Sequence, residues 1–200
     1  MTKGSGRDVF AGGQAGSGEI KKIRTPLEGD VIELLRSGEK VSLSGYIYTA
    51  RDAAHKRFAE VLDNRERLPF DLEGQIIYYC GPSPAPPGKV IGSCGPTTST
   101  RMDVYTPRLL SLGLKGMIGK GRRSPDVKAA LKKHGAVYFG ATGGAGALLS
   151  LSVISSEVIA YEDLGPEAVL RLEVRDMPLF VINDILGNDL YEEGVGRYRD

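Results

Sequence analysis

Apolar residues recur along the chain in short runs that glycine, proline and polar clusters separate, a pattern typical of alternating strands and short helices. Runs rich in β-branched and aromatic residues predict strands at 41–48, 75–80, 89–93, 114–119, 136–139, 158–161, 169–174 and 179–183. Apolar residues at helical spacing predict helices near 25–35, 50–62, 105–112 and 125–131. The pattern therefore predicts an α/β protein.

The two ends of the chain differ from its middle. The first 20 residues contain six glycines and few apolar residues, so we expect residues 1–22 to form a flexible N-terminal tail. Residues 191–200 are polar and are expected to form a C-terminal tail. The length of 200 residues suits one domain, which we place at residues 23–190.

Composition narrows the classes of function. The formal net charge is +1, and aromatic residues do not alternate with basic ones, so nothing indicates binding to nucleic acid. No apolar run approaches the roughly 20 residues needed to span a bilayer, and the first residues lack the apolar core of a signal peptide. We therefore expect no membrane contact and a cytoplasmic location.

The scarcity of cysteine and histidine limits metal chemistry. Cys80 and Cys94 are the only cysteines, and His55 and His134 the only histidines, which is too few for a cluster or thiolate metal site within this chain. Both cysteines lie in apolar runs, where a free thiol behaves as a small hydrophobe. We expect buried free cysteines, and no metal ligands.

Charged residues occur where predicted strands give way to helices. Thr49 is a candidate N-cap, which places Arg51 in the first helical turn, although the helix dipole favours negative charge at that end. His55 lies one turn further on the same face, either as a structural histidine or as part of a site. Lys120 follows another strand, and Ser124 is a candidate N-cap for the helix after it.

The segment 92–103 is the most informative. Gly95 and Pro96 end an apolar run, four hydroxyl residues follow, and then comes Arg101. Hydroxyls at a helix start with a nearby arginine suit an anion, although the simpler interpretation is a capped helix with a surface arginine. Thr97 begins the hydroxyl run at such a junction.

Arg51, Arg101 and Lys120 are together expected at the strand ends, where ligands gather in open α/β sheets. Two guanidinium groups can bind a dicarboxylate in a two-pronged manner. The glycine-rich segment 140–146 lacks the spacing of a dinucleotide loop and is better explained by close backbone approach. The residues alone predict a site for a small polyanionic acid.

Five motifs occur in an order found in one family: residues 49–57 (TARDAAHKR), 77–79 (IYY), 95–103 (GPTTSTRMD), 117–121 (MIGKG) and 161–165 (YEDLG). The chain resembles the β subunit, or C-terminal domain, of class I iron–sulfur fumarases and the related L-tartrate dehydratases. The resemblance covers residues 25 to 190 and implies a swivelling β/β/α fold, a mixed sheet with flanking helices.

The resemblance also implies a site shared with an α subunit, whose three cysteines hold a 4Fe–4S cluster. Matched by position, Arg51, Arg101 and Lys120 bind the substrate carboxylates, and Thr97 is the base that removes a proton beside a carboxylate. A threonine hydroxyl is a weak base, so this role requires nearby cations.

The implied reaction is the reversible hydration of fumarate to L-malate, in an α2β2 assembly with the α subunit. The motifs do not separate this reaction from the conversion of L-tartrate to oxaloacetate, which stays as the alternative. A non-catalytic module that binds a small anion stays as a further alternative.

Overall fold

The protein is represented by a computed structural model that describes residues 19–141 and 146–197. Its strands are β1 (Lys21–Arg24), β2 (Lys40–Thr49), β3 (Ile76–Tyr78), β4 (Gly116–Gly119), β5 (Val137–Gly140), β6 (Val153–Ala160) and β7 (Val169–Asn183). Its α-helices are α1 (Gly29–Glu33), α2 (Asp52–Asp63), α3 (Thr106–Ser111), α4 (Pro125–His134), α5 (Gly146–Leu151) and α6 (Leu190–Arg197). Two 3₁₀ helices, η1 (Ser99–Met102) and η2 (Glu162–Glu167), complete the described elements.

The strands form one mixed sheet that closes on itself. β2, β3, β4 and β5 pair in parallel in that order, β7 pairs antiparallel with β5, and β7 also pairs antiparallel with β2. These five strands therefore form a closed, barrel-like ring, to which β1 and β6 add at the edges of β2 and β7. This arrangement confirms the predicted α/β class and the mixed sheet.

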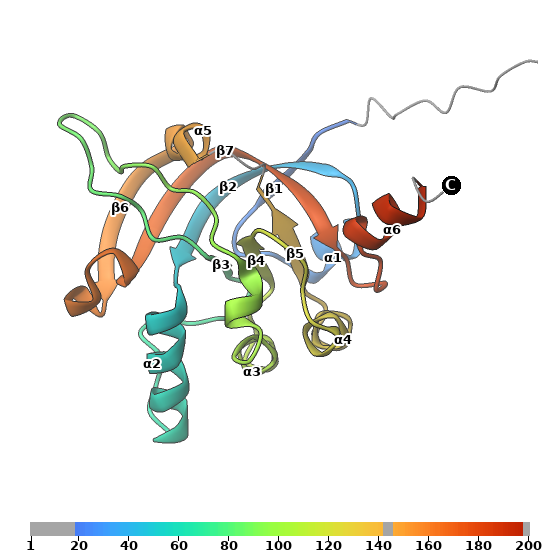
Figure 1. Cartoon of the computed structure of the whole chain (residues 1–200), viewed down its shortest axis with the longest axis horizontal. Helices are drawn as coiled ribbons and strands as arrows, with labels where there is room; N and C mark the ends of the chain where they lie inside the picture. The colour runs from blue at the N-terminus through green and yellow to red at the C-terminus, as the bar shows by residue number, and fades with distance from the viewer. Residues whose placement is uncertain (1–18, 142–145, 198–200) are drawn as a thin grey trace, which may run out of the picture.

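Both faces of the short parallel strands are buried, which is why they read as continuous apolar runs. In β3, Ile76 and Tyr78 point into the core enclosed by the ring, whereas Ile77 and the following residue Tyr79 belong to the core under the helices. Figure 1 shows α2, α3 and α4 on one side of the sheet and α5 on the other. The helices thus flank the sheet as expected.

Two expected elements are wrong in the region before the site. The helix expected from residue 25 begins at Gly29, because the N–H groups of Thr25 and Leu27 donate to carbonyls of Ser44 and Gly74 instead of starting a helix. Residues 89–93 form no strand. They belong to a loop in which Ser83 and Ser93 bond to each other, with Ser83 N–H donating to Ser93 O at 3.0 Å.

The C-terminal part is more regular than expected. The two strands expected at 169–174 and 179–183 form one strand, β7, because a β-bulge with φ 49° at Asp176 bends the chain without ending the pairing. Residues 191–197, expected in a polar tail, form most of α6. Residues 1–18 of the expected N-terminal tail, residues 142–145 of the glycine-rich segment and residues 198–200 lie outside the described part; Lys21 and Lys22, expected in that tail, pair in β1.

Candidate functional site

The carboxyl ends of three parallel strands bring the sequence-predicted residues to one edge of the sheet. Arg51 follows β2, and Lys120 follows β4. Thr97 lies between the ends of β3 and β4, because its N–H donates to Tyr79 O at 2.6 Å and its carbonyl accepts from Lys120 N at 3.2 Å. Thr98 continues the same contact as an isolated parallel bridge to Lys120. Segments far apart in the sequence therefore meet here; Arg51, Thr97, Arg101 and Lys120 are called the strand-end site below.

The two arginines of the strand-end site meet at one carboxylate. Arg101 Nε lies 2.8 Å from Asp52 Oδ1, and Arg51 Nη2 lies 3.9 Å from Asp52 Oδ2. The Arg101 side chain is 53% exposed and that of Arg51 23%, so both can be reached from solvent. Two guanidinium groups that share one carboxylate neighbour can together bind an anion with more than one carboxylate.

Glu167 of η2 takes the capping role that Thr49 was expected to fill. The Thr49 hydroxyl is buried at the end of β2, where it donates to Ala168 O and accepts from Leu170 N–H. The N-cap of α2 is Arg51, with no side-chain cap of its own. Glu167 instead accepts the Ala53 N–H at 3.0 Å through Oε2 and lies 3.4 Å from Arg51 Nη2 through Oε1.

Thr97 and Lys120 present side chains that the described parts of the chain leave without a hydrogen-bond partner or ion pair. Thr97 is half-buried and Lys120 is exposed. Together with the Nη groups of Arg101, they offer donors and positive charge at a single edge. Chemically, this arrangement suits an anion with carboxylate groups.

A buried arginine, Arg123, follows Lys120 of the strand-end site by three residues. Arg123 is buried, and its Nε lies 2.8 Å from Asp103 Oδ1, while its Nη2 donates to Thr106 Oγ1 at 2.8 Å. Its guanidinium carbon lies 5.3 Å from the ring centre of Tyr79 and 5.0 Å from that of Tyr138. These five residues, called the Arg123 cluster, connect the segment after Lys120 to η1 and α3. Sequence reasoning missed them.

His55 is a buried link to Arg51. Its Nδ1 lies 2.8 Å from Arg51 O, so the neutral tautomer donates from Nδ1, and its Nε2 is buried without a hydrogen-bond partner. Burial lowers the pKa of His55 to about 4, and the positive charge of Arg123 acts in the same direction. The histidine is therefore neutral at physiological pH, which agrees with a structural role.

The described residues do not fit a metal or cluster site of this chain's own. They contain no group of three or more histidine, cysteine, aspartate or glutamate side chains gathered around one point. Cys80 and Cys94 are both free and buried, with Sγ atoms 2.7 Å apart. The contact with Cys94 and burial raise the pKa of the Cys80 thiol, which keeps it protonated.

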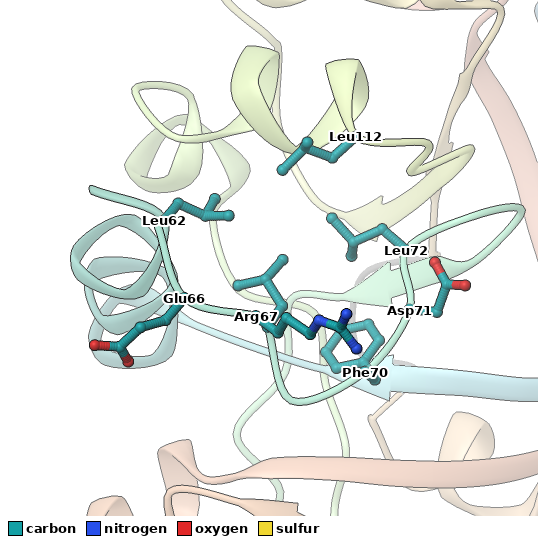
Figure 2. A pocket seen from close by; sticks show the side chains of 8 residues that line it. Leu62, Glu66, Arg67, Phe70, Asp71, Leu72 and Leu112 are labelled. Carbon is teal, nitrogen blue, oxygen red and sulfur yellow. The ribbon is translucent and has the colours of Figure 1, made fainter. Parts of the chain in front are cut away.

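A large hollow lies away from the strand-end site. Figure 2 shows this shallow cavity of about 450 Å³ at the C-terminal end of α2, with Leu62, Leu72 and Leu112 beside it and Glu66 turned away. Leu62 follows Arg51 by eleven residues, which is about 16 Å along the helix. None of the four residues of the strand-end site lines this hollow. The hollow is therefore separate from the strand-end site.

Within residues 19–141 and 146–197, no helix is both long and apolar enough to cross a membrane.

Sequence reasoning found the four exposed or half-exposed members of the site but missed the residues that surround them. Asp52 lies within the motif at 49–57 but was given no role of its own. Glu167 follows the motif at 161–165, to which no role was given. The signal that could have found Asp52 is its place directly after Arg51, where an acid both suits the helix dipole and neutralises a neighbouring cation.

Comparison with known proteins gives the same picture at family level. A family model described as "Fumarase C-terminus" matches residues 13–194. The aerobic class I fumarate hydratase of Escherichia coli K12 is 40% identical over 185 residues, which cover 88% of this chain and 34% of that enzyme. Fumarate hydratase 2 of Leishmania major is 42% identical over 158 residues, covering 78% of this chain and 28% of that protein.

A further relative is shorter. A protein of Methanocaldococcus jannaschii with the provisional name L(+)-tartrate dehydratase subunit beta is 40% identical over 168 residues, which cover 81% of this chain and 86% of that protein. By contrast, this chain spans about a third of the length of the Escherichia coli enzyme.

The fold and the strand-end site define a mixed α/β domain that presents cationic side chains and a threonine at one edge of a closed sheet. The chain belongs to the fumarase C-terminus family.

Proposed function

We propose that this chain is the β subunit of a hydro-lyase that interconverts fumarate and L-malate, with the swivelling β/β/α fold of that class. The observation that carries the proposal is the meeting of Arg51, Arg101, Thr97 and Lys120 at one sheet edge, where Lys120 N–H donates to Thr97 O and both arginines contact Asp52. Membership of the fumarase C-terminus family supports the reaction class. In this proposal, the 4Fe–4S cluster belongs to an α subunit, in an α2β2 assembly.

The two arginines bind the carboxylates of the substrate. Arg101 has both Nη groups without a partner among the described residues, so it can bind one carboxylate through two parallel hydrogen bonds. Arg51, half-buried beside Gly81, binds the other carboxylate. Binding both ends orients the carbon–hydrogen bond that must break.

Thr97 acts as the base. Its alkoxide takes the proton from the carbon next to a carboxylate of L-malate, and the electron pair left on that carbon forms the double bond as the hydroxyl leaves the neighbouring carbon; the cluster of the α subunit would supply the Lewis acid for this hydroxyl. Lys120, joined to Thr97 through the backbone, and the arginines stabilise the alkoxide by their charge. The exposed position of Lys120 means that this stabilisation depends on water being excluded in the assembled site.

A specific observation favours tartrate as the second candidate. The relative from Methanocaldococcus jannaschii matches this chain over 86% of its own length, as a subunit of similar extent would. The strand-end site suits either acid, since both carry two carboxylates. The alternative function is therefore the β subunit of an L-tartrate dehydratase.

The test is co-expression of the full chain with its candidate α subunit without oxygen, followed by fumarate absorbance after addition of L-malate. Activity that requires both chains supports the proposal, whereas oxaloacetate formed only from L-tartrate changes the substrate. If the complex has an intact cluster but converts neither acid, the result would favour a non-catalytic anion-binding module.

Four variants make the assay specific. Thr97→Ala should lower kcat by about a thousandfold, the scale of a lost general base, whereas Thr97→Ser should retain much of it. Arg101→Ala should raise KM. Arg108→Ala is the matched control, because Arg108 is a similarly exposed arginine that pairs with Asp63 at the far end of α2. A Thr97→Ala complex with near-normal turnover would exclude Thr97 as the base.

A further inference from the structure

Asp52 lies between the two arginines of the strand-end site. It is the first residue of α2, and its Oδ1 forms an ion pair with Arg101 Nε, 2.8 Å away. Its Oδ2 is buried without a hydrogen-bond partner and lies 3.9 Å from Arg51 Nη2. The Asp52 side chain is 31% exposed, so it is more enclosed than the Arg101 side chain, which is 53% exposed.

This contact determines which part of Arg101 faces outward. An exposed arginine side chain has many rotamers, and binding a ligand requires that one of them be fixed. Asp52 is the one carboxylate that pairs with Arg101 in the described residues, and the contact is made at Nε. The two Nη groups are left as a parallel pair for an end-on contact with a carboxylate.

We propose that Asp52 is a positioning residue of the strand-end site. It fixes the Arg101 side chain beside Arg51, so that both guanidinium groups can bind one dicarboxylate. The inference rests on the proposed function and deepens it, since it explains how the long side chains of Arg51 and Arg101 are held at a fixed separation. Asp52 acts through Arg101 and does not itself touch the substrate.

Two simpler roles for Asp52 give different expectations. If Asp52 served only as a negative charge at the helix N-terminus, Asp52→Asn and Asp52→Ala would have equal effects, because both remove the charge. If it served only as a charge near the site, removing it would favour a dianion and lower KM. Positioning predicts a higher KM, with Asn better than Ala because the dipole of the amide oxygen still attracts the Arg101 guanidinium.

The first experiment measures KM and kcat for the assembled complex. We expect Asp52→Ala to raise KM by about fivefold, the upper range for a partly exposed ion pair, and Asp52→Asn by about threefold, with kcat changed less than KM. In an Arg101→Met background, Asp52→Ala should add less than about twofold, because its partner is already gone. Asp63→Ala, which removes the acid that pairs with Arg108 at the other end of α2, is the matched control. Equal effects of Ala and Asn, a lower KM, or additive effects with Arg101→Met would overturn the inference.

The second experiment needs no activity. In the full chain labelled with ¹⁵N, the nearby Asp52 carboxylate should shift the Arg101 Nε–H resonance, and Asp52→Ala should remove that shift while Asp63→Ala leaves it. An unchanged Arg101 resonance in Asp52→Ala would overturn the inference whatever the complex does. If the wild-type complex converts neither L-malate nor L-tartrate, the proposed function fails, and this measurement still decides whether Asp52 fixes Arg101.

Discussion

Arg101 and Arg123 lie on neighbouring segments yet stand in opposite environments. The Arg123 side chain is fully buried, lies between two tyrosine rings and bonds to Asp103 and Thr106. The Arg101 side chain is 53% exposed and has one carboxylate contact, through Nε. One arginine has its donors occupied by the protein, and the other has two donor groups free among the described residues.

This difference separates a residue that stabilises the site from one that can bind a ligand. A buried arginine with satisfied donors joins the segments around it, here the turn after β4 and the start of α3. An exposed arginine that is oriented by a single contact retains binding capacity for an anion. The predictions below test this distinction, from the largest expected effect to the smallest.

Replacing Arg123 should affect folding far more than replacing Arg101. Arg123→Met leaves the Asp103 carboxylate, whose side chain is only 11% exposed, without its cation, and we expect the free energy of unfolding to fall by about 3–5 kcal/mol. Arg101→Met should cost less than about 1 kcal/mol, because exposed ion pairs contribute little. Urea unfolding of the isolated chain measures both. Equal losses in the two variants would contradict the distinction.

His55 connects the two regions, and its buried neutral state predicts a pH dependence. Its ring lies 5.4 Å from that of Tyr79, and its Nδ1–H donates to Arg51 O. Burial lowers its pKa to about 4 in the folded chain, against about 6.5 when unfolded, so between these values the unfolded state binds more protons. The stabilisation is complete above pH 6.5 and is lost as the pH falls toward 4.

The expected loss from this group is about 2 kcal/mol on going from pH 7.5 to pH 5. The measurement is the free energy of unfolding at the two pH values for the wild type and for His55→Asn, whose side-chain amide can still donate to Arg51 O. The difference between the two proteins isolates the histidine from other titrating groups. An identical pH dependence in both would show that His55 does not titrate in this way.

The sequence predicted the strand-end site better than the fold around it. Arg51 and Lys120 could be placed because each follows an apolar run that forms a parallel strand, and the carboxyl ends of such strands meet at one edge. Thr97 reaches the same edge through its bonds to Tyr79 and Lys120, although the run before it forms no strand. The closure of the sheet through β7 could not be predicted from the sequence, because the pairing between β2 and β7 joins residues more than 120 positions apart. A bulge at Asp176 also looks like a strand end in the sequence.

The residues around the site were missed for a related reason. Arg123 and Lys120 lie in one basic segment, and only packing against Tyr79 and Tyr138 distinguishes the buried arginine from the exposed lysine. Thr49 has the right residue type for an N-cap, but β2 extends as far as Thr49, and the Thr49 hydroxyl oxygen accepts the Leu170 N–H instead. Glu167 then caps α2 from a segment more than 100 residues away, which no local pattern reveals.

Thr106 tests the Arg123 cluster at a single hydroxyl. Its Oγ1 accepts from Arg123 Nη2 and donates to Met102 O at 2.9 Å, so Thr106→Val keeps the shape and leaves a buried guanidinium N–H unpaired. We expect the free energy of unfolding to fall by about 1–3 kcal/mol. Thr100→Val, at an exposed threonine of η1, should change it by less than about 0.5 kcal/mol. A Thr106→Val protein as stable as the wild type would mean that Arg123 does not depend on this bond.

Gly81 tests the strand-end site with the smallest change in stability. A Cβ at this position would lie 2.8 Å from Arg51 Nη1, 3.0 Å from Arg51 Cδ and 3.0 Å from Pro166 O. Gly81→Ala therefore displaces the Arg51 side chain and crowds the Pro166 carbonyl, and we expect a stability cost of about 1 kcal/mol. Substrate binding should be affected more than stability, because the displaced Arg51 guanidinium no longer meets a substrate carboxylate. KM in the assembled complex should therefore rise about threefold to tenfold. The control is Gly29→Ala, where an added Cβ meets nothing within 4 Å. An unchanged KM in Gly81→Ala would show that Arg51 is not held in its binding position by the space that Gly81 leaves.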